Sequence, residues 1–436
     1  MRIGRQGAAS ITTREVRDML NREESDGMPK QPRTSDICQR FGLVRVINAA
    51  GPVTRLGASP ISEEVVAAMS AAAQCSVDIG ELQGRASELI SQYTGAEAGI
   101  VTSGATAGLL LGAAACIAGC DPLKMSRLPD STGMRNEFIV SRSHRNSYDH
   151  GVRAAGARLI EVGLPDRIAG CGTRDAEAWE FEGAIGNQTA GILYLARADS
   201  RPDLASVVRV ARAANIPVLV DAAAELPPAR NLRRFIEEGA DLVVFSGGKA
   251  LGGPSGSGLL CGRRRLVGSA LLQQLDLDGR YEDWRPPPQL IDKKEYAGVP
   301  RNGIGRSCKV GKEQIIGLLT ALTRFAQEDD DARNKRLGVI AKALVAALTD
   351  LPGLKVGMTE DWGHGAMPLV EVLISAEAGK PNALQIAARL RSATPAVHVD
   401  RGNADQGVLT LVPTCLGAAD AAVIRAAFET SLAAGP

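Results

Sequence analysis

Short runs of apolar residues alternate along the chain with longer stretches rich in alanine, a pattern that predicts strands separated by helices. Seven such runs precede residue 262, at 99–102, 137–140, 158–162, 191–195, 217–220, 242–245 and 258–261. Strands joined by helical crossovers form a mainly parallel, doubly wound sheet. The last two runs are too close together for a helical crossover, so we expect the final strand to be antiparallel. The pattern therefore predicts an α/β fold.

A second pattern follows in the C-terminal part of the chain. Helical periodicity and strand-like runs return there, at 313–328, 331–348, 367–373 and 407–412. We therefore expect a large domain over residues 42–319 and a small α+β domain over residues 320–436.

Two segments do not fit either pattern. Residues 276–301 are polar and rich in proline, which predicts a long excursion or lid. Residues 1–41 form a polar leader that we expect to be partly flexible, with one short helix possible over residues 11–20.

Composition narrows the class of protein. The chain has 436 residues, 45% of them hydrophobic and 23% charged, with a net charge of +1 and four histidines. No basic, aromatic surface is indicated, so we expect no nucleic-acid partner. There is neither an apolar run long enough for a membrane helix nor a signal-like N-terminus, which predicts a cytoplasmic protein. Eight scattered cysteines without CxxC spacing indicate reduced thiols and no metal site.

The candidate chemistry centres on Lys249 and Asp221. Lys249 follows the run 242–245 in a turn of small residues, where flanking glycines let a flat ligand approach the backbone. Asp221, 28 residues upstream, ends the run 217–220. Alone, either residue could be an ordinary turn or cap residue. Together they are the pair that a pyridoxal phosphate enzyme needs, a lysine for the Schiff base and a carboxylate that keeps the pyridine nitrogen protonated.

The stretch from Ser246 to Pro254 resembles the pyridoxal lysine segment of bacterial selenocysteine synthase and its relatives, enzymes of the aspartate aminotransferase-like (type I) fold. Segments 46–57, 94–98 and 303–313 resemble the D-glucosaminate-6-phosphate ammonia-lyase branch of these relatives. The resemblance extends from about residue 42 to the C-terminus. It implies a seven-stranded large domain, a smaller C-terminal domain and pyridoxal 5′-phosphate as the cofactor.

The resemblance also implies how the cofactor is held. The strand-to-helix turn at residues 103–106 offers free backbone N–H groups, although such a turn also occurs as a simple helix cap. In the type I fold this turn binds the cofactor phosphate, so the role passes to Ser103, Gly104, Ala105 and Thr106, with Ser246 as a second donor. His144 would stack on the cofactor ring, and Ala223 would contact its opposite face.

Three cations, Arg306, Lys309 and Lys312, follow one another at spacings of three residues. We expect them on the opening turn of a helix, where cations oppose the helix dipole unless an anion binds. Their pattern resembles the ammonia-lyase branch and departs from the arginine-rich segment of selenocysteine synthases. Together with Arg55 they are candidates for binding the anionic end of a substrate; a solvated charged face is the alternative.

The resulting prediction is a lyase that eliminates water and ammonia from a hydroxylated, phosphorylated 2-amino acid similar to D-glucosaminate-6-phosphate, giving a 2-keto-3-deoxy acid. Selenium or sulfur transfer to a phosphoseryl substrate, transamination and racemisation share the same cofactor chemistry and stay open. A non-catalytic pyridoxal-binding regulator is the alternative outside enzymes. A nicotinamide dehydrogenase is disfavoured because no G-x-G-x-x-G follows the first strand.

The expected partners are a small-molecule amino acid or amino sugar acid and further copies of the chain. We expect a homodimer or a higher symmetric homo-oligomer, with the 276–301 excursion reaching across the interface. The pattern predicts no membrane partner.

Overall fold

Seven strands form the main sheet of the structure, a computed structural model that describes residues 34–164, 175–277, 279–359, 367–375 and 380–433. Their order in the sheet is β2-β8-β7-β6-β5-β3-β4. The bounds are β2 Ala98–Thr102, β3 Glu137–Ser141, β4 Arg158–Val162, β5 Thr189–Leu195, β6 Val218–Asp221, β7 Leu242–Ser246 and β8 Gly258–Gly262. β8 is antiparallel to both of its neighbours, and the other strands pair in parallel. The predicted strands and the antiparallel last strand are confirmed.

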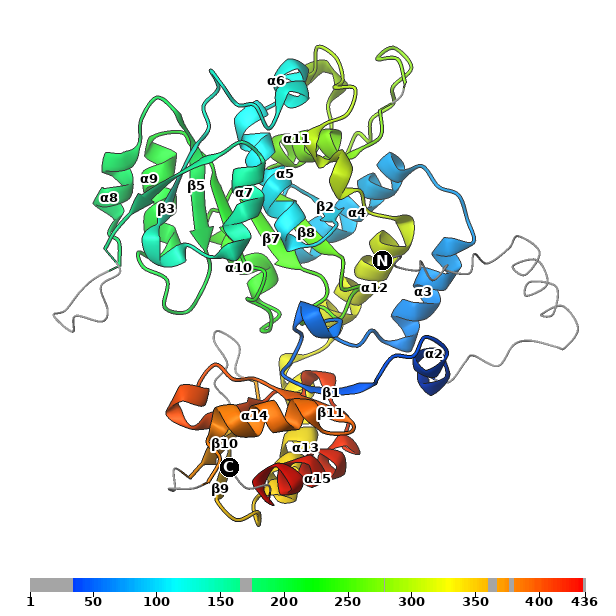
Figure 1. Ribbon diagram of the computed structural model, residues 1–436. Helices are drawn as coiled ribbons and strands as arrows, with labels where there is room; N and C mark the ends of the chain where they lie inside the picture. Colours follow the sequence, from blue (N-terminus) through cyan, green and yellow to red (C-terminus); the bar gives the residue numbers. More distant parts are fainter. Residues whose placement is uncertain (1–33, 165–174, 278, 360–366, 376–379, 434–436) are drawn as a thin grey trace, which may run out of the picture.

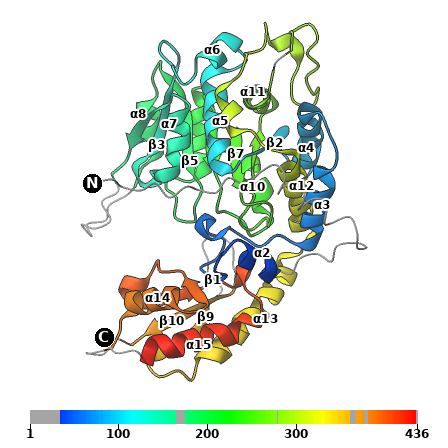
Figure 2. The ribbon, with the colours of Figure 1, turned by 45° about the vertical axis from the view of Figure 1, so that its right-hand side comes forward.

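Helices cover both faces of this sheet, which explains why its strands read as continuous apolar runs. In β6, Val218 and Val220 face one core, and Leu219 faces the other. The first core is covered by α4 (Ile79–Thr94), α8 (Ala178–Ala184), α9 (Leu204–Ala213), α10 (Asn231–Glu237) and α12 (Lys312–Gln327). The second is covered by α5 (Ala105–Ala118), α6 (Pro122–Arg127), α7 (His150–Ala154) and α11 (Arg264–Gln274). Helix α3 (Glu63–Ala73) lies beside α12 (Figure 2).

Helix α5 packs closely on the sheet because glycines stand where it meets the strands. A Cβ at Gly108 would lie 3.0 Å from Val244, and one at Gly112 would lie 3.0 Å from Leu219. This close approach fixes the N-terminus of α5 at the edge of the sheet where β6 and β7 end. A ligand at that edge can therefore contact the first turn of α5.

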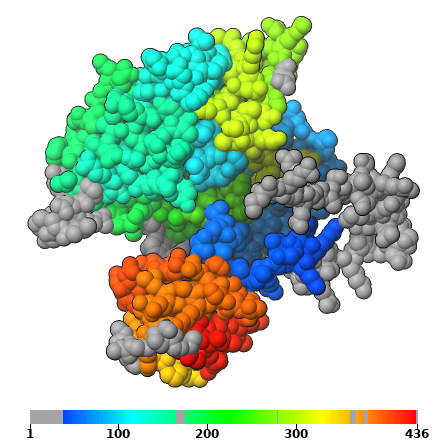
Figure 3. Space-filling model, viewed as in Figure 1, coloured from blue at the N-terminus to red at the C-terminus, as the bar shows by residue number. Residues whose placement is uncertain are grey.

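A smaller α+β part, orange and red in Figure 1, lies below the large one. Its antiparallel sheet has the order β12-β10-β9, and a separate parallel pair joins β1 to β11. The elements are β1 Val46–Ala49, α13 Asp330–Leu348, β9 Leu354–Thr359, β10 Leu369–Ile374, α14 Ala383–Ser392, β11 Ala396–Val399, β12 Val408–Leu411 and α15 Asp420–Ala433. The helices and strands predicted after residue 312 are present. Figure 3 shows the blue N-terminal stretch beside the junction of the two parts.

Strand β1 belongs to the small part although it precedes the large one in sequence. Ile47 and Ala49 lie in one hydrophobic core with residues of α13, β10, α14 and α15. The chain thus contributes a strand to the small part before it enters the main sheet. The division into residues 1–41, 42–319 and 320–436 stays a prediction.

The remaining elements are short. They are α2 Thr34–Arg40 and the 3₁₀ helices Thr54–Leu56, Arg142–His144, Ser147–Asp149, Lys293–Glu295, Ile304–Cys308, Ala404–Gln406 and Pro413–Cys415. Of these, only Lys293–Glu295 lies in the predicted excursion 276–301. The predicted helix over residues 11–20 lies outside the described residues. Within the described ranges, no helix combines the length and the apolar character needed to span a membrane.

Candidate active site

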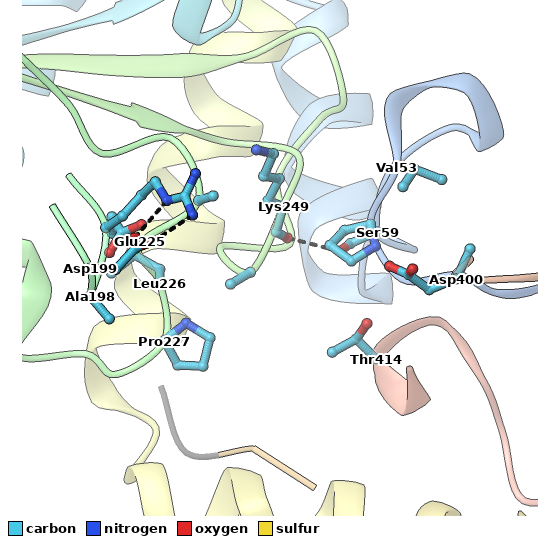
Figure 4. A pocket seen from close by; sticks show the side chains of 15 residues that line it. Val53, Ser59, Ala198, Asp199, Glu225, Leu226, Pro227, Lys249, Asp400 and Thr414 are labelled. Atoms are coloured by element: carbon cyan, nitrogen blue, oxygen red, sulfur yellow. Dashed lines mark hydrogen bonds and ion pairs between the residues drawn. The ribbon is translucent and has the colours of Figure 1, made fainter. Parts of the chain in front are cut away.

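The turn that carries Lys249 is closely packed. It joins β7 to β8, and a Cβ at Gly248 would lie only 2.6 Å from the Cα of Ser255, so a larger residue there would clash with backbone. Ser59 fixes the turn from outside. Its hydroxyl donates a hydrogen bond to the Lys249 carbonyl at 2.8 Å (Figure 4), and its backbone N–H donates to the Gly248 carbonyl at 2.9 Å.

Lys249 and Asp221 interact electrostatically at the ends of adjacent strands. Asp221 is 6% exposed, and its Oδ1 accepts a hydrogen bond from the Ala223 N–H at 3.1 Å. Burial raises the pKa of Asp221, while this hydrogen bond and Lys249 lower it. Burial also lowers the pKa of Lys249, against the effect of Asp221 and Glu225. Burial therefore shifts both groups toward their uncharged forms, and a positive group beside Asp221 would stabilise its carboxylate.

His144 ends the 3₁₀ helix Arg142–His144 that follows β3, and it is 4% exposed. Its Nδ1 accepts a hydrogen bond from the Leu195 N–H at 3.4 Å. Leu195 pairs with Asp221 in the β5–β6 register, so this hydrogen bond ties the His144 segment to the strand next to the one that ends in Asp221. Burial lowers the pKa of His144 to about 4, so the ring is neutral at pH 7. Its Nε2 is buried and has no hydrogen-bond partner within the described residues.

The N-terminus of α5 is open to an anion. Gly104 is its N-cap, with a φ of 97°, and no side chain caps this end. The Ser103 hydroxyl instead donates a hydrogen bond to the Cys308 carbonyl at 3.0 Å. Gly258, which pairs with Ser246 between β7 and β8, presses against the turn: a Cβ there would lie 2.6 Å from the Gly104 carbonyl carbon. The two predicted phosphate-binding groups, residues 103–106 and Ser246, are therefore neighbours.

These features fit pyridoxal phosphate. The uncapped helix end supplies donors for a phosphate, Asp221 is a buried carboxylate suited to a ring N–H, and Lys249 is a desolvated amine nearby. His144 supplies a flat, neutral ring at the same edge of the sheet. The individual roles of these residues stay predictions.

A cavity of about 540 Å³ opens beside Lys249 and has walls from both parts of the fold (Figure 4). Its size suits a small-molecule ligand. Of the residues predicted for the site, only Lys249 lines it. The lining residues are Ala50, Pro52, Val53, Ser59, Arg197, Ala198, Asp199, Ala224, Glu225, Leu226, Pro227, Lys249, Ala250, Asp400 and Thr414.

Several polar residues of this cavity were not predicted from the sequence, among them Glu225 and Arg197. Glu225 is 5% exposed, and burial raises its pKa to about 7. Arg197 forms an ion pair with Asp199 at 2.9 Å. A signal for Glu225 existed, since this carboxylate stands four residues after Asp221 in an otherwise apolar run that ends in two prolines. We know of no comparable signal for Arg197, which stands in a polar loop.

The expected placement of the three cations on one opening helical turn is wrong. Arg306 lies in the 3₁₀ helix Ile304–Cys308, Lys309 follows it, and only Lys312 begins α12. Helix α12 starts late because the Gln314 side chain accepts a hydrogen bond from the Gly311 N–H at 3.0 Å and so closes the first turn there.

None of the predicted anion-binding residues lines the cavity of Lys249. Arg306 and Lys309 line a second cavity of about 620 Å³, which they share with parts of the 276–301 segment. Arg306 is paired with Asp276 at 2.5 Å. The Lys312 ammonium donates to the Ala73 carbonyl at 3.2 Å. Arg55 lies near His398 of β11.

Comparison with known proteins agrees with the geometry. The model of the L-seryl-tRNA selenium transferase family matches residues 46–280. D-glucosaminate-6-phosphate ammonia lyase of Salmonella typhimurium is 32% identical over 401 residues, which cover 90% of this chain and 97% of that protein. 5′-C-glycyluridine monooxygenase-decarboxylase of a Streptomyces species is 29% identical, and the match covers 87% of each chain.

A solved structure of D-glucosaminate-6-phosphate ammonia-lyase superposes with a TM-score of 0.73 at 31% identity and covers 92% of this chain and 98% of that one. The predicted type I fold, with its mainly parallel seven-stranded sheet and smaller C-terminal domain, is confirmed. The cofactor of these enzymes is pyridoxal 5′-phosphate, as Lys249 and Asp221 predict. The chain belongs to the L-seryl-tRNA selenium transferase family of pyridoxal phosphate enzymes.

Proposed function

We propose that this protein is a lyase that eliminates water and ammonia from a hydroxylated, phosphorylated 2-amino acid similar to D-glucosaminate-6-phosphate. The β-hydroxyl leaves as water, and hydrolysis of the resulting imine by one water molecule releases ammonia and gives the 2-keto-3-deoxy acid. The observation that carries the proposal is that Lys249 and Glu225 line the same cavity. An amine whose pKa is lowered and a carboxyl whose pKa is about 7 suit proton removal at one carbon and proton delivery at the next. The ammonia lyase of Salmonella typhimurium, at 32% identity, supports this choice within the family.

Pyridoxal phosphate, when bound, supplies an electron sink that acidifies the Cα–H bond of the amino acid attached to it. Lys249 would hold the cofactor, and its Nζ, when free, would serve as the base for the Cα proton. Glu225, with a pKa of about 7, is partly protonated at neutral pH and donates its proton to the departing β-hydroxyl group. Asp221 keeps the pyridine nitrogen protonated.

The same proposal gives the other predicted residues their roles. The backbone N–H groups of residues 103–106 hold the cofactor phosphate, and Ser246 adds a donor from β7. His144 would lie against one face of the ring and Ala223 against the other. The uncapped start of α5 and the neutral state of the imidazole support these assignments.

We place the cations of the second cavity in the active site of a neighbouring copy. Arg306, Lys309 and Lys312 do not line the cavity of Lys249 in their own chain, and the first two share their cavity with the 276–301 segment. A homodimer or a symmetric multiple of it would let this segment reach another subunit. The cytoplasm suits such an enzyme, because all cysteines within the described residues are free thiols.

Mixing two inactive variants tests this shared site. If Arg306 serves a neighbouring Lys249, hybrids of Lys249→Ala and Arg306→Ala subunits regain part of the activity, because one of their two sites is intact. Hybrids without any activity, or a fully active monomer in sedimentation, would contradict the shared site.

The function itself is tested with a panel of amino sugar acids and β-hydroxy amino acids, phosphorylated and unphosphorylated. We expect equal amounts of ammonia and 2-keto acid from the phosphorylated amino sugar acids. Lys249→Ala should release neither, and Lys124→Ala, which changes an exposed lysine of α6, should behave as the wild type. Amino-group transfer without ammonia, inversion of Cα, or turnover of phosphoseryl substrates alone would favour the transaminase, racemase or selenium-transfer alternatives.

The cofactor site has its own test. Borohydride reduction followed by peptide mass analysis should find the pyridoxyl group on the peptide that contains Lys249. A label on another lysine would refute the assignment.

A further inference from the structure

The parallel pair β1–β11 forms part of the wall between the small part and the cavity of Lys249. Its side chains alternate between two faces. Ile47 and Val397 point into the core of the small part. Ala50 and Asp400 directly follow β1 and β11. They lie on the face opposite to this core and line the cavity. His398 lies two residues before Asp400 and therefore lies on the cavity side of the pair, toward its rim.

Arg55 meets His398 at this rim. Its Nη1 lies 3.3 Å from the Nδ1 of His398, and it follows Val53, which lines the cavity, by two residues. A guanidinium group can only donate hydrogen bonds, so Nδ1 is the acceptor and the ring proton is on Nε2. Arg55 is exposed and His398 is half-buried. The rim thus has a cation and a neutral N–H donor side by side.

The arginines at this rim have no ion-pair partner within the described residues, although the carboxylate of Asp400 stands two residues after His398. Burial lowers the pKa of His398, and so do three nearby arginines, Arg55, Arg391 and Arg401. In the part of the chain that the structure describes, none of the three is paired with a carboxylate. Arg197 and Arg306, in contrast, are each paired with an aspartate. An anion bound at the rim would therefore interact favourably with arginines that no carboxylate already neutralises by an ion pair.

We propose that Arg55 and His398, in the field of Arg391 and Arg401, form a subsite for a phosphate group at the far end of the substrate. Lys249 and Asp400 lie on different walls of the cavity (Figure 4). A substrate whose amine is held at Lys249 therefore points its other end toward the small part. The inference rests on the proposed function for the identity of the substrate, but the subsite can be tested without turnover.

The test measures binding of two sugar acids that lack the reactive amine. Isothermal titration calorimetry on the holoenzyme compares 6-phosphogluconate with gluconate, which differ only in the terminal phosphate. We expect the wild type to prefer 6-phosphogluconate. Arg55→Ala and His398→Gln should each weaken its binding about 10- to 100-fold and leave gluconate unchanged, because one charge-assisted contact to phosphate is lost.

Arg45→Ala is the matched control, since Arg45 is an exposed arginine directly before β1. It should keep the wild-type preference, and equal melting temperatures should show that all variants are folded. The subsite is refuted if the wild type has no preference for phosphate, if both rim variants keep it, or if Arg306→Ala alone removes it. A lost preference in the rim variants without any lyase activity in the wild type would support the subsite and refute the proposed function.

Discussion

Replacing Gly258 by alanine tests whether the first turn of α5 holds the cofactor phosphate. The new Cβ would lie 2.6 Å from the carbonyl carbon of Gly104 and 2.8 Å from the nitrogen of Ala105. Both are backbone atoms, so no side-chain rotation relieves the contact. Either the turn at residues 103–106 or strand β8 must therefore shift.

The size of the effect follows from which segment moves. Strand β8 is held by backbone hydrogen bonds to β2 and β7 along its whole length. The turn is held by two side-chain hydrogen bonds, one from the Ser103 hydroxyl to the Cys308 carbonyl and one from the Thr102 hydroxyl to the Gly104 carbonyl. The turn should therefore give way. Overpacking costs about 1–3 kcal/mol of stability. Loss of one charge-assisted hydrogen bond to phosphate, about 1.5–3 kcal/mol, raises the Kd of the cofactor by one to two decades.

The assay is a spectroscopic titration of the cofactor-free protein with pyridoxal phosphate, together with its melting temperature. Gly256→Ala is the matched control in the same connection, because a Cβ there meets nothing within 4 Å. It should bind the cofactor as the wild type does. A folded Gly258→Ala variant with wild-type cofactor affinity would refute the assignment of residues 103–106.

Three further predictions concern charge. Asp221→Asn should bind the cofactor but lose about 10² or more in kcat, because the stabilised positive charge on the ring nitrogen is lost. Since burial raises the pKa of Glu225 to about 7, the wild type should lose stability as pH rises through that value. Glu225→Gln should remove this loss of stability, as urea unfolding at pH 5 and pH 8 would reveal. The same variant should lack the change in kcat/KM near pH 7 that the pH profile of the wild type shows. Arg333 is 5% exposed and paired with Glu328 and Asp330, so Arg333→Ala should lower the free energy of unfolding by about 3–5 kcal/mol. Arg336→Ala, at the exposed end of the same cluster, should cost less than about 1 kcal/mol by thermal melting.

The main sheet could be predicted from the sequence because its strands are buried on both faces. Such strands appear as apolar runs, and two residues were recognisable beside them. Asp221 ends one run, and Lys249 follows another in a turn of small residues. The reversed direction of β8 followed from the length of one connection. The link between β1 and β11 had no such signal, because two short strands far apart in the chain pair through tertiary contacts alone.

The cation segment illustrates a second limit. A spacing of three residues fits an α-helix and a 3₁₀ helix almost equally, so Arg306 and Lys312 could not be assigned to separate elements from spacing. Glu225 lies in the loop after β6. The predicted strand ends before this loop, so the sequence did not indicate where the side chain of Glu225 would lie. Its raised pKa arises from burial in the folded site, which the sequence alone does not specify.

The stretch from β1 to Ser59 is attached at both of its ends to different bodies. β1 is hydrogen-bonded into the small part, and Ser59 is hydrogen-bonded to the turn of Lys249. It is a short segment that connects the two bodies. Any rotation of the small part toward the sheet would pull or push this segment and so displace the backbone that carries the lysine. Occupancy at the distant end of the cavity would then be transmitted mechanically to the amine, without a contact between the two.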